Sequence, residues 1–350
     1  MKKALLMLII AIAAFSLYAQ PAAEVNAKPE TFIFTDSLDR QIELPSNLEK
    51  IVPSGNLAQM VLYSVAPEKI VGWSSKLSNA AKEYFLQDTV NLPVFGTFYG
   101  KKANLNKEAL IYAGPEVVID MGEIKGSKEA MTSDLDKLSS DIAIPVVFIE
   151  NYLDNTPDAY RTLGKLLDKE ERAEKLASYS EKALEMAASA REKIATPVTV
   201  YYSSSEDGLE AIPEGSFHGE VIEKVGGKNI VPSSFTNKNG SSVSMEQLYL
   251  WNPDVILLSN KAAYDNATTS DVWANLDAVK NKRVYLVPTV PYSFIDSPPA
   301  NNRIIGMYWL GNILYPELFD VDVVKEVQDF YSLFYSHDLT ADQAKTILGN

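Results

Sequence analysis

The chain of 350 residues contains no cysteine. Disulfide bridges, thiolate metal sites and cysteine nucleophiles are therefore excluded. The same absence excludes a lipid-modified N-terminal cysteine, the usual tether of exported receptors in cells with a single membrane. The fold must be stabilised by packing, hydrogen bonds and charge alone.

Positive charge and histidine are also scarce. Lysine and arginine number 32 against 46 aspartates and glutamates, which gives a formal net charge of −14. This balance argues against nucleic acid as a partner, because phosphates bind to basic surfaces. The only histidines, His218 and His337, are too few for a three-histidine metal cage, so a bare transition-metal ion is disfavoured as a ligand.

Long hydrophobic runs are missing beyond the start of the chain. After two lysines, the apolar run 4–15 is too short to span a bilayer, and Ala19 is a plausible cleavage residue. Residues 1–19 are therefore predicted to be a signal peptide, followed by a flexible tether at 20–31. An exported, acidic chain that is not a lipoprotein indicates the periplasm.

From Ile51 onward, short apolar segments alternate with helical patterns on either side of a long helical stretch. This alternation predicts mostly parallel sheets with helices on both faces. Before it, residues 31–34 and 41–44 are expected to form a small hairpin. The predicted fold class is α/β, with two Rossmann-like lobes joined by a single long rigid α-helix. We expect an N-terminal lobe at 32–156, a helical linker at 157–196 with the interlobe helix at about 168–194, and a C-terminal lobe at 197–350.

The interlobe helix is predicted from its ends and from its small residues. Asp168 followed by Glu171 is typical of a capping box, and Pro197 ends the helical pattern. Alanines recur between them at steps of three and four residues, which lets a helix pack closely. One stiff helix in place of flexible strands predicts only a small lobe closure.

Each predicted lobe contains the same short unit. Asn106 opens a two-turn helix with Glu108 at its second position, and Ser244 opens another with Glu246 at the same position. In both units a proline follows seven residues after the glutamate, and an acidic residue and a buried strand come next. An internal repeat of this kind supports two lobes of similar structure.

Together these features resemble the substrate-binding proteins of the iron-siderophore, haem and cobalamin uptake family. The resemblance covers the whole mature chain and also rests on the hairpin around 36–40, on Gly226-Gly227-Lys-Asn-Ile and on the segment 298–316. It implies the class III periplasmic-binding-protein architecture, no enzymatic activity and no intrinsic cofactor. The implied partners are an inner-membrane ABC permease dimer and its ATPase subunits, and the implied state is a monomer.

The resemblance also implies that one glutamate on each lobe contacts arginines of the permease. Glu108 and Glu246 stand at the matching positions. The alternative is that each carboxylate simply interacts favourably with the dipole of its own helix. The repetition at the same offset in both lobes favours docking.

A ligand is expected between the lobes, at the carboxyl ends of the strands. The loops there carry aromatic and polar residues, which as a group favour an apolar, aromatic ligand over a bare ion. Taken singly, each could instead be a half-buried packing residue. The candidate ligand-binding residues are Asn56, Trp73, Tyr99, Met121, Phe217, His218, Tyr292, Phe294 and Arg303.

Two of these candidates allow a second interpretation. His218 precedes a predicted helix, where it could contact the iron of a bound complex or bond to the backbone. Arg303 could meet an anionic ligand or form a structural ion pair. The resemblance implies a small metal chelate, either a ferric siderophore or haem, with a corrinoid such as cobalamin as the alternative.

Two other function classes are alternatives to transport. An enzyme is disfavoured because the sequence has no G-x-S-x-G, G-x-G-x-x-G or Walker motif. A ligand-sensing receptor with the same lobes and no transport role is a further alternative, which differs from the transport protein only in its membrane partner.

Overall fold

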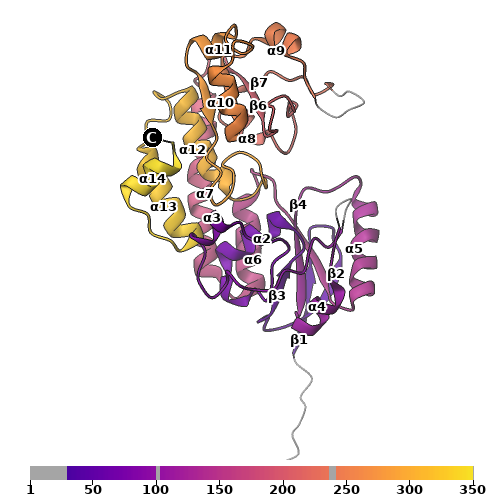
Figure 1. Ribbon diagram of the computed structural model, residues 1–350. Helices are drawn as coiled ribbons and strands as arrows, with labels where there is room; N and C mark the ends of the chain where they lie inside the picture. The colour runs from indigo at the N-terminus through magenta and orange to yellow at the C-terminus, as the bar shows by residue number, and fades with distance from the viewer. Residues whose placement is uncertain (1–29, 100–102, 236–241, 350) are drawn as a thin grey trace, which may run out of the picture.

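Two parallel β-sheets form the centres of the two lobes (Figure 1). The computed structural model describes residues 30–99, 103–235 and 242–349. The first sheet has the order β3-β4-β5 and the second the order β7-β6-β8-β9, and the pairings in both are parallel. Their strands are β3 (Ile51–Pro53), β4 (Val117–Gly122), β5 (Val146–Glu150), β6 (Thr199–Ser203), β7 (Lys228–Asn229), β8 (Val255–Leu258) and β9 (Val284–Leu286).

A β-hairpin precedes the first sheet, as the sequence predicts. Its strand β1 (Thr31–Thr35) pairs antiparallel with β2 (Gln41–Pro45). The Asp36 carboxylate stabilises the turn, because it accepts hydrogen bonds from the backbone amide (3.1 Å) and the guanidinium (2.6 Å) of Arg40. Arg40 also donates to the carbonyl of Val146 (2.8 Å), which anchors the hairpin to β5.

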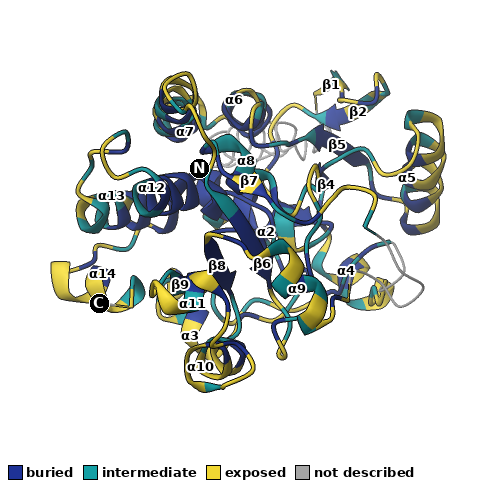
Figure 2. Ribbon diagram, turned by 90° about the horizontal axis from the view of Figure 1, so that it is seen from above, coloured by how far each residue is buried: buried dark blue, intermediate teal, exposed yellow. Residues whose placement is uncertain are grey.

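Helices cover both faces of the sheets, so the central strands are buried on both sides (Figure 2). Such strands are continuous apolar runs, as in other parallel sheets. In the first half the helices are α2 (Asn56–Val65), the 3-10 turn η1 (Pro67–Lys69), α3 (Asn79–Lys82), α4 (Lys107–Ala113), α5 (Lys128–Ile142) and α6 (Thr156–Leu167). They are followed by α7 (Glu170–Arg191), α8 (Glu220–Lys224), α9 (Met245–Trp251), α10 (Lys261–Thr269), α11 (Asp277–Lys280), α12 (Asn302–Leu314), α13 (Val323–Tyr335) and α14 (Ala341–Ile347).

The 22-residue helix α7 runs from one lobe to the other, which confirms the predicted fold class (Figure 1). Its start differs from the prediction. Asp168 has a φ of 53° and ends α6 in the left-handed conformation, and the N-cap residue of α7, Lys169, makes no side-chain cap bond. The predicted capping box of Asp168 and Glu171 is therefore wrong.

Helix α6 packs beside α7 and does not extend it. Arg161 of α6 donates to Glu174 (2.8 Å) and to Glu181 (2.6 Å) of α7. In one straight helix, Arg161 and Glu181 would lie about 30 Å apart, because each residue adds about 1.5 Å. The two helices form a hairpin in which Gly164 faces Ala173.

Each lobe has a hydrophobic cluster of its own, and a third, larger cluster is shared between the two lobes. A single cluster of buried residues includes side chains from α2, α6, α7, α12 and α13. Helix α13 belongs to the segment 197–350 that was expected to form the second lobe, yet it packs on α2. Arg172 of α7 ties the two together, because it donates to the carbonyls of Ser64 (2.9 Å) and Leu333 (2.6 Å). The lobes therefore cannot move far apart without exposing this core.

Within the three described ranges, none of the helices is long and apolar enough to cross a membrane. The predicted signal peptide at 1–19 lies outside the described residues. So does the predicted tether at 20–31, apart from its last two residues; β1 begins at Thr31.

The substitution Gly164→Ala is expected to force α6 and α7 apart. A Cβ atom at residue 164 would lie 2.6 Å from the Cβ of Ala173, which is closer than two packed carbon atoms come. Overpacking of this kind costs about 1–3 kcal/mol, and we expect that decrease in the free energy of unfolding measured by chemical denaturation.

The double variant Gly164→Ala/Ala173→Gly is the control, because it removes the atom that the new methyl group meets. Its loss of stability should be smaller than the sum of the two single losses. If the two losses simply add, the helices do not pack through these residues.

Candidate functional site

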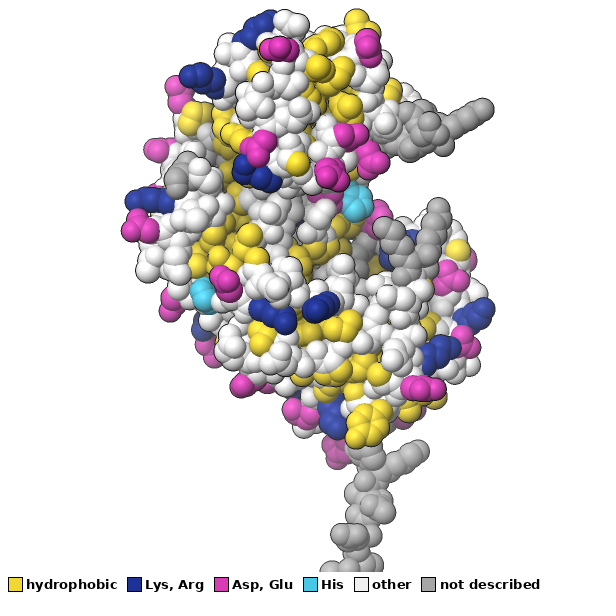
Figure 3. All heavy atoms as spheres, in the orientation of Figure 1, with side chains coloured by type: hydrophobic (Ala, Val, Ile, Leu, Met, Phe, Trp, Pro, Cys, Tyr) yellow, Lys and Arg dark blue, Asp and Glu magenta, His cyan; other side chains and the backbone are white. Residues whose placement is uncertain are grey.

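A pocket of about 330 Å³ lies between the two lobes, and Figure 3 shows the surface hollowed there. Its first-lobe wall is built by segments at the carboxyl ends of β3 and β4. This is where open parallel sheets usually bind ligands. The lining residues are Ser54, Gly55, Asn56, Leu57, Ala58, Thr97, Tyr99, Asp120, Met121, Gly122, Glu123 and Lys125 from the first lobe, and Phe217, His218 and Pro299 from the second.

The N-terminus of α2 forms part of this wall. Its N-cap is Gly55, which offers no side-chain cap, and its first turn contains no acidic residue. The amide of Gln59 donates to the carbonyl of Gly55 (2.9 Å), so the amides before it have no acceptor within the helix. Residues 55–58 all line the pocket. Free amides and the positive end of the helix dipole make this wall attractive to an anion.

A buried carboxyl group lies beside the helix end. Asp120, near the end of β4, is 3% exposed and accepts hydrogen bonds from the hydroxyls of Ser54 and Tyr99. Burial raises the pKa of Asp120, although these two hydrogen bonds oppose the rise. Burial and the nearby Asp120 also raise the pKa of Tyr99, which keeps it a phenol. Lys125 donates to the Tyr99 oxygen (3.3 Å) and adds a positive charge to the wall.

His218 lies on the second-lobe wall and is paired with Asp296. Its Nδ1 bonds to the Asp296 carboxylate, whose side chain is 6% exposed. This hydrogen bond raises the pKa of His218, although desolvation opposes the rise. Because Nδ1 is engaged, Nε2 is the ring nitrogen that can face a ligand or the metal of a bound complex. In the described parts of the chain, no group of three or more histidine, aspartate and glutamate side chains is placed to hold a metal ion.

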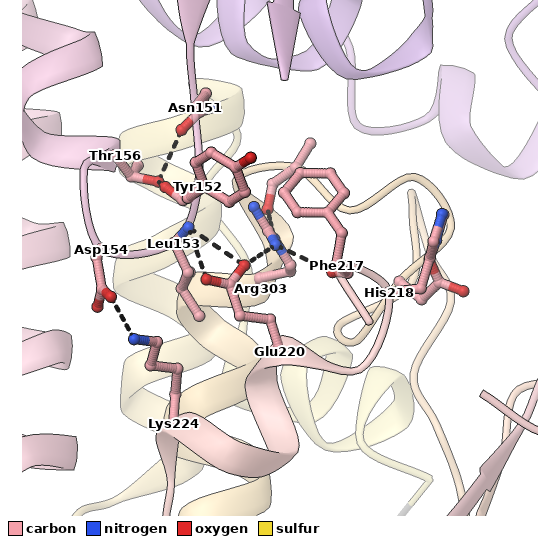
Figure 4. Close-up of polar contacts among 12 residues, drawn as sticks. Asn151, Tyr152, Leu153, Asp154, Thr156, Phe217, His218, Glu220, Lys224 and Arg303 are labelled. Atoms are coloured by element: carbon pink, nitrogen blue, oxygen red, sulfur yellow. Dashed lines mark hydrogen bonds and ion pairs between the residues drawn. The ribbon is translucent and has the colours of Figure 1, made fainter. Parts of the chain in front are cut away.

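Behind the pocket, a buried ion pair connects the two lobes (Figure 4). Arg303 is 1% exposed, and its Nη1 lies 2.5 Å from the Oε2 of Glu220. Glu220 also accepts from the backbone amide of Leu153 (3.3 Å), which belongs to the first lobe. The ring of Phe217 contacts the Arg303 guanidinium, at 4.6 Å from the ring centre, and the ring of Tyr152, with 5.6 Å between the ring centres. Arg303 therefore forms the structural ion pair and positions Phe217.

Five of the candidate ligand-binding residues line this pocket, namely Asn56, Tyr99, Met121, Phe217 and His218. The other four candidates, Arg303 and three aromatic residues, do not line the pocket. Trp73 is 1% exposed and its Nε1 donates to the carbonyl of Thr89 (2.8 Å). Phe294 is fully buried, and the Tyr292 hydroxyl accepts from the side chain of Gln59 (3.3 Å). Their rings turn into the core, because a position after a strand does not fix the direction of the side chain.

Two pocket residues, Asp120 and Lys125, and the partner of His218, Asp296, were not predicted from the sequence. Asp120 had a signal, because it is the one charged residue within an apolar strand, and a buried carboxyl group at a strand end is a candidate for function. Lys125 and Asp296 had none. Their roles depend on contacts with Tyr99 and His218, which are distant in the sequence.

The two candidate docking glutamates lie outside the pocket. Glu108 and Glu246 are exposed at the second positions of α4 and α9, at the outer ends of the two lobes (Figure 1). Asn106 and Ser244 cap these helices by accepting an amide hydrogen bond three residues on, at 3.0 and 3.2 Å. Hydrogen bonds from its own amide and from Ser244 lower the pKa of Glu246. The predicted repeat is confirmed, since α4 leads into β4 and α9 into β8.

Comparisons with known proteins match this chain to solute-binding proteins. The model of a family described as periplasmic binding protein matches residues 57–291. The structure of an ABC transporter solute binding protein from Sulfurospirillum deleyianum is 30% identical, and the alignment covers 91% of this chain and 99% of that chain with a TM-score of 0.81.

Two curated proteins are also similar, and their names state ligands. The molybdate-binding protein MolA of Haemophilus influenzae is 24% identical over 337 residues, which cover 89% of this chain and 93% of MolA. The Fe(3+)-citrate-binding protein YfmC of Bacillus subtilis is 25% identical over 207 residues, which cover 58% of this chain and 63% of YfmC.

The pair of His218 and Asp296 is expected to stabilise the fold most at acidic pH. The folded-state pKa of His218 is raised above its usual value of 6.5, so folding favours the protonated ring. This contribution is fully present below the unfolded-state pKa and is lost as the pH rises through the folded-state pKa. The difference in free energy of unfolding between the wild type and Asp296→Asn should therefore narrow as the pH rises above about 6.5.

Denaturation at each pH measures this difference, and an NMR titration of the His218 ring should show a lower pKa in Asp296→Asn. His337→Gln, which removes the other histidine, is the control and should leave the narrowing unchanged. An unaltered His218 titration in Asp296→Asn would contradict the role of the carboxylate.

Proposed function

Because the chain belongs to the periplasmic binding protein family, we propose that it captures a ferric complex of an anionic, oxygen-rich chelator and delivers it to an ABC importer. It is a solute-binding protein of an ABC transporter, and not an enzyme. In this proposal the chain is exported to the periplasm by a cleaved signal peptide. It works there as a monomer without an intrinsic cofactor.

The observation that supports an anionic ligand is the uncapped N-terminus of α2 in the pocket wall. The ammonium of Lys125 lies in the same pocket, and the raised pKa of His218 favours the protonated, cationic form of its ring. The raised pKa of Asp120 favours its uncharged form, which repels an anion less and can donate a hydrogen bond. These groups suit the carboxylate or hydroxamate oxygens of an iron chelator.

The size of the pocket supports a chelate over a simple ion. Its volume of about 330 Å³ lies at the lower end of the range for small-molecule sites, about 300–1,000 Å³, and exceeds what a four-oxygen anion fills. A small ferric chelate fits this space, and the protonated ring of His218 can donate a hydrogen bond from Nε2 to the oxygens of the chelator. Haem and corrinoids are the larger alternatives, and they would extend beyond the pocket. The name of YfmC, Fe(3+)-citrate-binding protein, agrees with the first choice.

Molybdate is the second candidate. It is favoured by the match to the molybdate-binding protein MolA, which extends over 89% of this chain. A tetrahedral oxyanion would bind to the amides of residues 55–58 and leave the rest of the pocket to water. The two candidates therefore share the anion site and differ in how much of the pocket they fill.

Delivery requires a surface that the importer recognises. We propose that Glu108 and Glu246 dock on basic side chains of the inner-membrane permease dimer, one on each lobe. Both carboxylates face solvent, and they occupy equivalent positions in two similar helices. The lobes share a core, so the separation of the two glutamates changes little when a ligand binds.

Calorimetric titration of the ligand-free protein tests the ligand class, with ferric citrate, molybdate, haemin and cobalamin as separate probes. Saturable binding of ferric citrate is expected. Lys125→Gln should weaken it about tenfold or more, because a charge-assisted hydrogen bond is lost. Lys137→Gln, which changes an exposed lysine of α5 outside the pocket, is the matched control and should bind as the wild type does.

The outcomes separate the candidates. Binding of molybdate without ferric citrate would replace the first candidate by the second. Binding of haemin or cobalamin alone would replace the small chelate by a larger one. If none of the four probes binds, the proposed ligand class is wrong.

The double variant Glu108→Arg/Glu246→Arg is expected to abolish importer-dependent uptake of ferric citrate while its affinity for ferric citrate is unchanged. Reversed charges would repel the basic groups of the permease and leave the pocket intact. Glu129→Arg is the matched control, because Glu129 is also exposed at the second position of a capped helix, α5. Normal uptake by the double variant would refute the docking role.

A further inference from the structure

Large hydrophobic side chains that face solvent gather beside the two docking glutamates. Seven such side chains are exposed among the described residues. Ile111 and Tyr112 belong to α4 and Leu250 to α9, while Val272 lies next to α9, where its carbonyl accepts from Tyr249. Figure 3 shows hydrophobic side chains on the surface at the two ends of the molecule, where Figure 1 places α4 and α9.

The exposed residues follow the same repeat as the glutamates. Leu110 and Leu248, two residues after each glutamate, are both 0% exposed and anchor their helices to the lobes. Tyr112 and Leu250, four residues after each glutamate, are 94% and 79% exposed. The helices are therefore held by the two buried leucines, and the fold does not require an apolar side chain at either exposed position.

The spacing of four residues places each apolar side chain beside its glutamate. Residues i and i+4 of an α-helix lie on one face, one turn apart. Each lobe thus presents one carboxylate and one large apolar side chain on the same face of a helix. An exposed ion pair contributes little net affinity, whereas a buried aromatic or aliphatic anchor can dominate an interface.

We propose that Tyr112 and Leu250 are the apolar anchors with which the two lobes bind the permease dimer. This inference rests on the proposed docking of Glu108 and Glu246. The partner that fits presents a basic side chain next to an apolar recess, and it presents this pair twice. A symmetric dimer presents each of its surfaces twice, which suits a pair of similar helices at opposite ends of one molecule. The glutamates set register and association rate, and the anchors supply affinity.

Binding of the full-length protein to its permease–ATPase complex in lipid nanodiscs tests the proposal by biolayer interferometry. Tyr112→Ser/Leu250→Ser should weaken binding about tenfold or more at both low and high salt. Glu108→Ala/Glu246→Ala should weaken it mainly at low salt, because salt screens exposed charges. Leu86→Ser is the matched control, since it removes another exposed leucine away from α4 and α9 and should bind as the wild type does.

Other results would overturn the anchors, the docking proposal or both. Wild-type affinity of Tyr112→Ser/Leu250→Ser, with impaired binding of the glutamate variant, would overturn the anchors and leave the docking proposal intact. Wild-type affinity of both variants would overturn both. Wild-type dimers in sedimentation velocity that disappear in Tyr112→Ser/Leu250→Ser, with unchanged permease binding, would assign the surface to a second copy of this chain and overturn the inference. Unfolding free energies measured in parallel confirm that the variants are folded.

Discussion

The structure depends on a helical core that neither lobe can complete alone. The first sheet has three strands and the second four, and helices from both halves of the chain must cover them. Helices α2, α7, α12 and α13 meet in one cluster of buried residues. Arg172 reinforces this junction by bonding to backbone carbonyls of α2 and α13. Separation of the lobes would expose apolar surface and unpair buried polar groups, so the pocket between them is largely preformed.

In a preformed pocket, the charged and polar groups are already in position before a ligand binds. Amides of the α2 terminus, the ammonium of Lys125 and the raised pKa of His218 all favour negative charge. Burial raises the pKa of Asp120 and so disfavours its negative charge, which leaves Glu123 as the other acidic residue of the pocket. Because these groups are already ordered, little conformational entropy is lost on binding. Selectivity between anions of the same charge then depends on the size of the anion and on whether it contacts His218.

Features encoded by local sequence were predicted, and features that depend on distant contacts were not. The hairpin, the buried strands and the caps of α4 and α9 follow from residues within a few positions of one another. The turn at Asp168 could not be predicted in this way, because an aspartate is compatible with both a capping box and a left-handed helix end. The inward rings of Trp73 and Phe294 depend on the shared core. The pairing of Arg303 with Glu220 joins residues 83 apart in the chain, which no sequence period reveals.

The connection of α4 to β4 has a mechanical consequence. The six residues of β4 place α4 at one end of a stiff element of about 20 Å and Asp120 near the other. Strand β4 therefore connects the pocket directly to α4 through a stiff, buried element. The second lobe repeats the arrangement with α9 and β8. The helices that carry Glu108 and Glu246 are thus each one strand away from the interlobe pocket, without a flexible loop between the helix and the sheet.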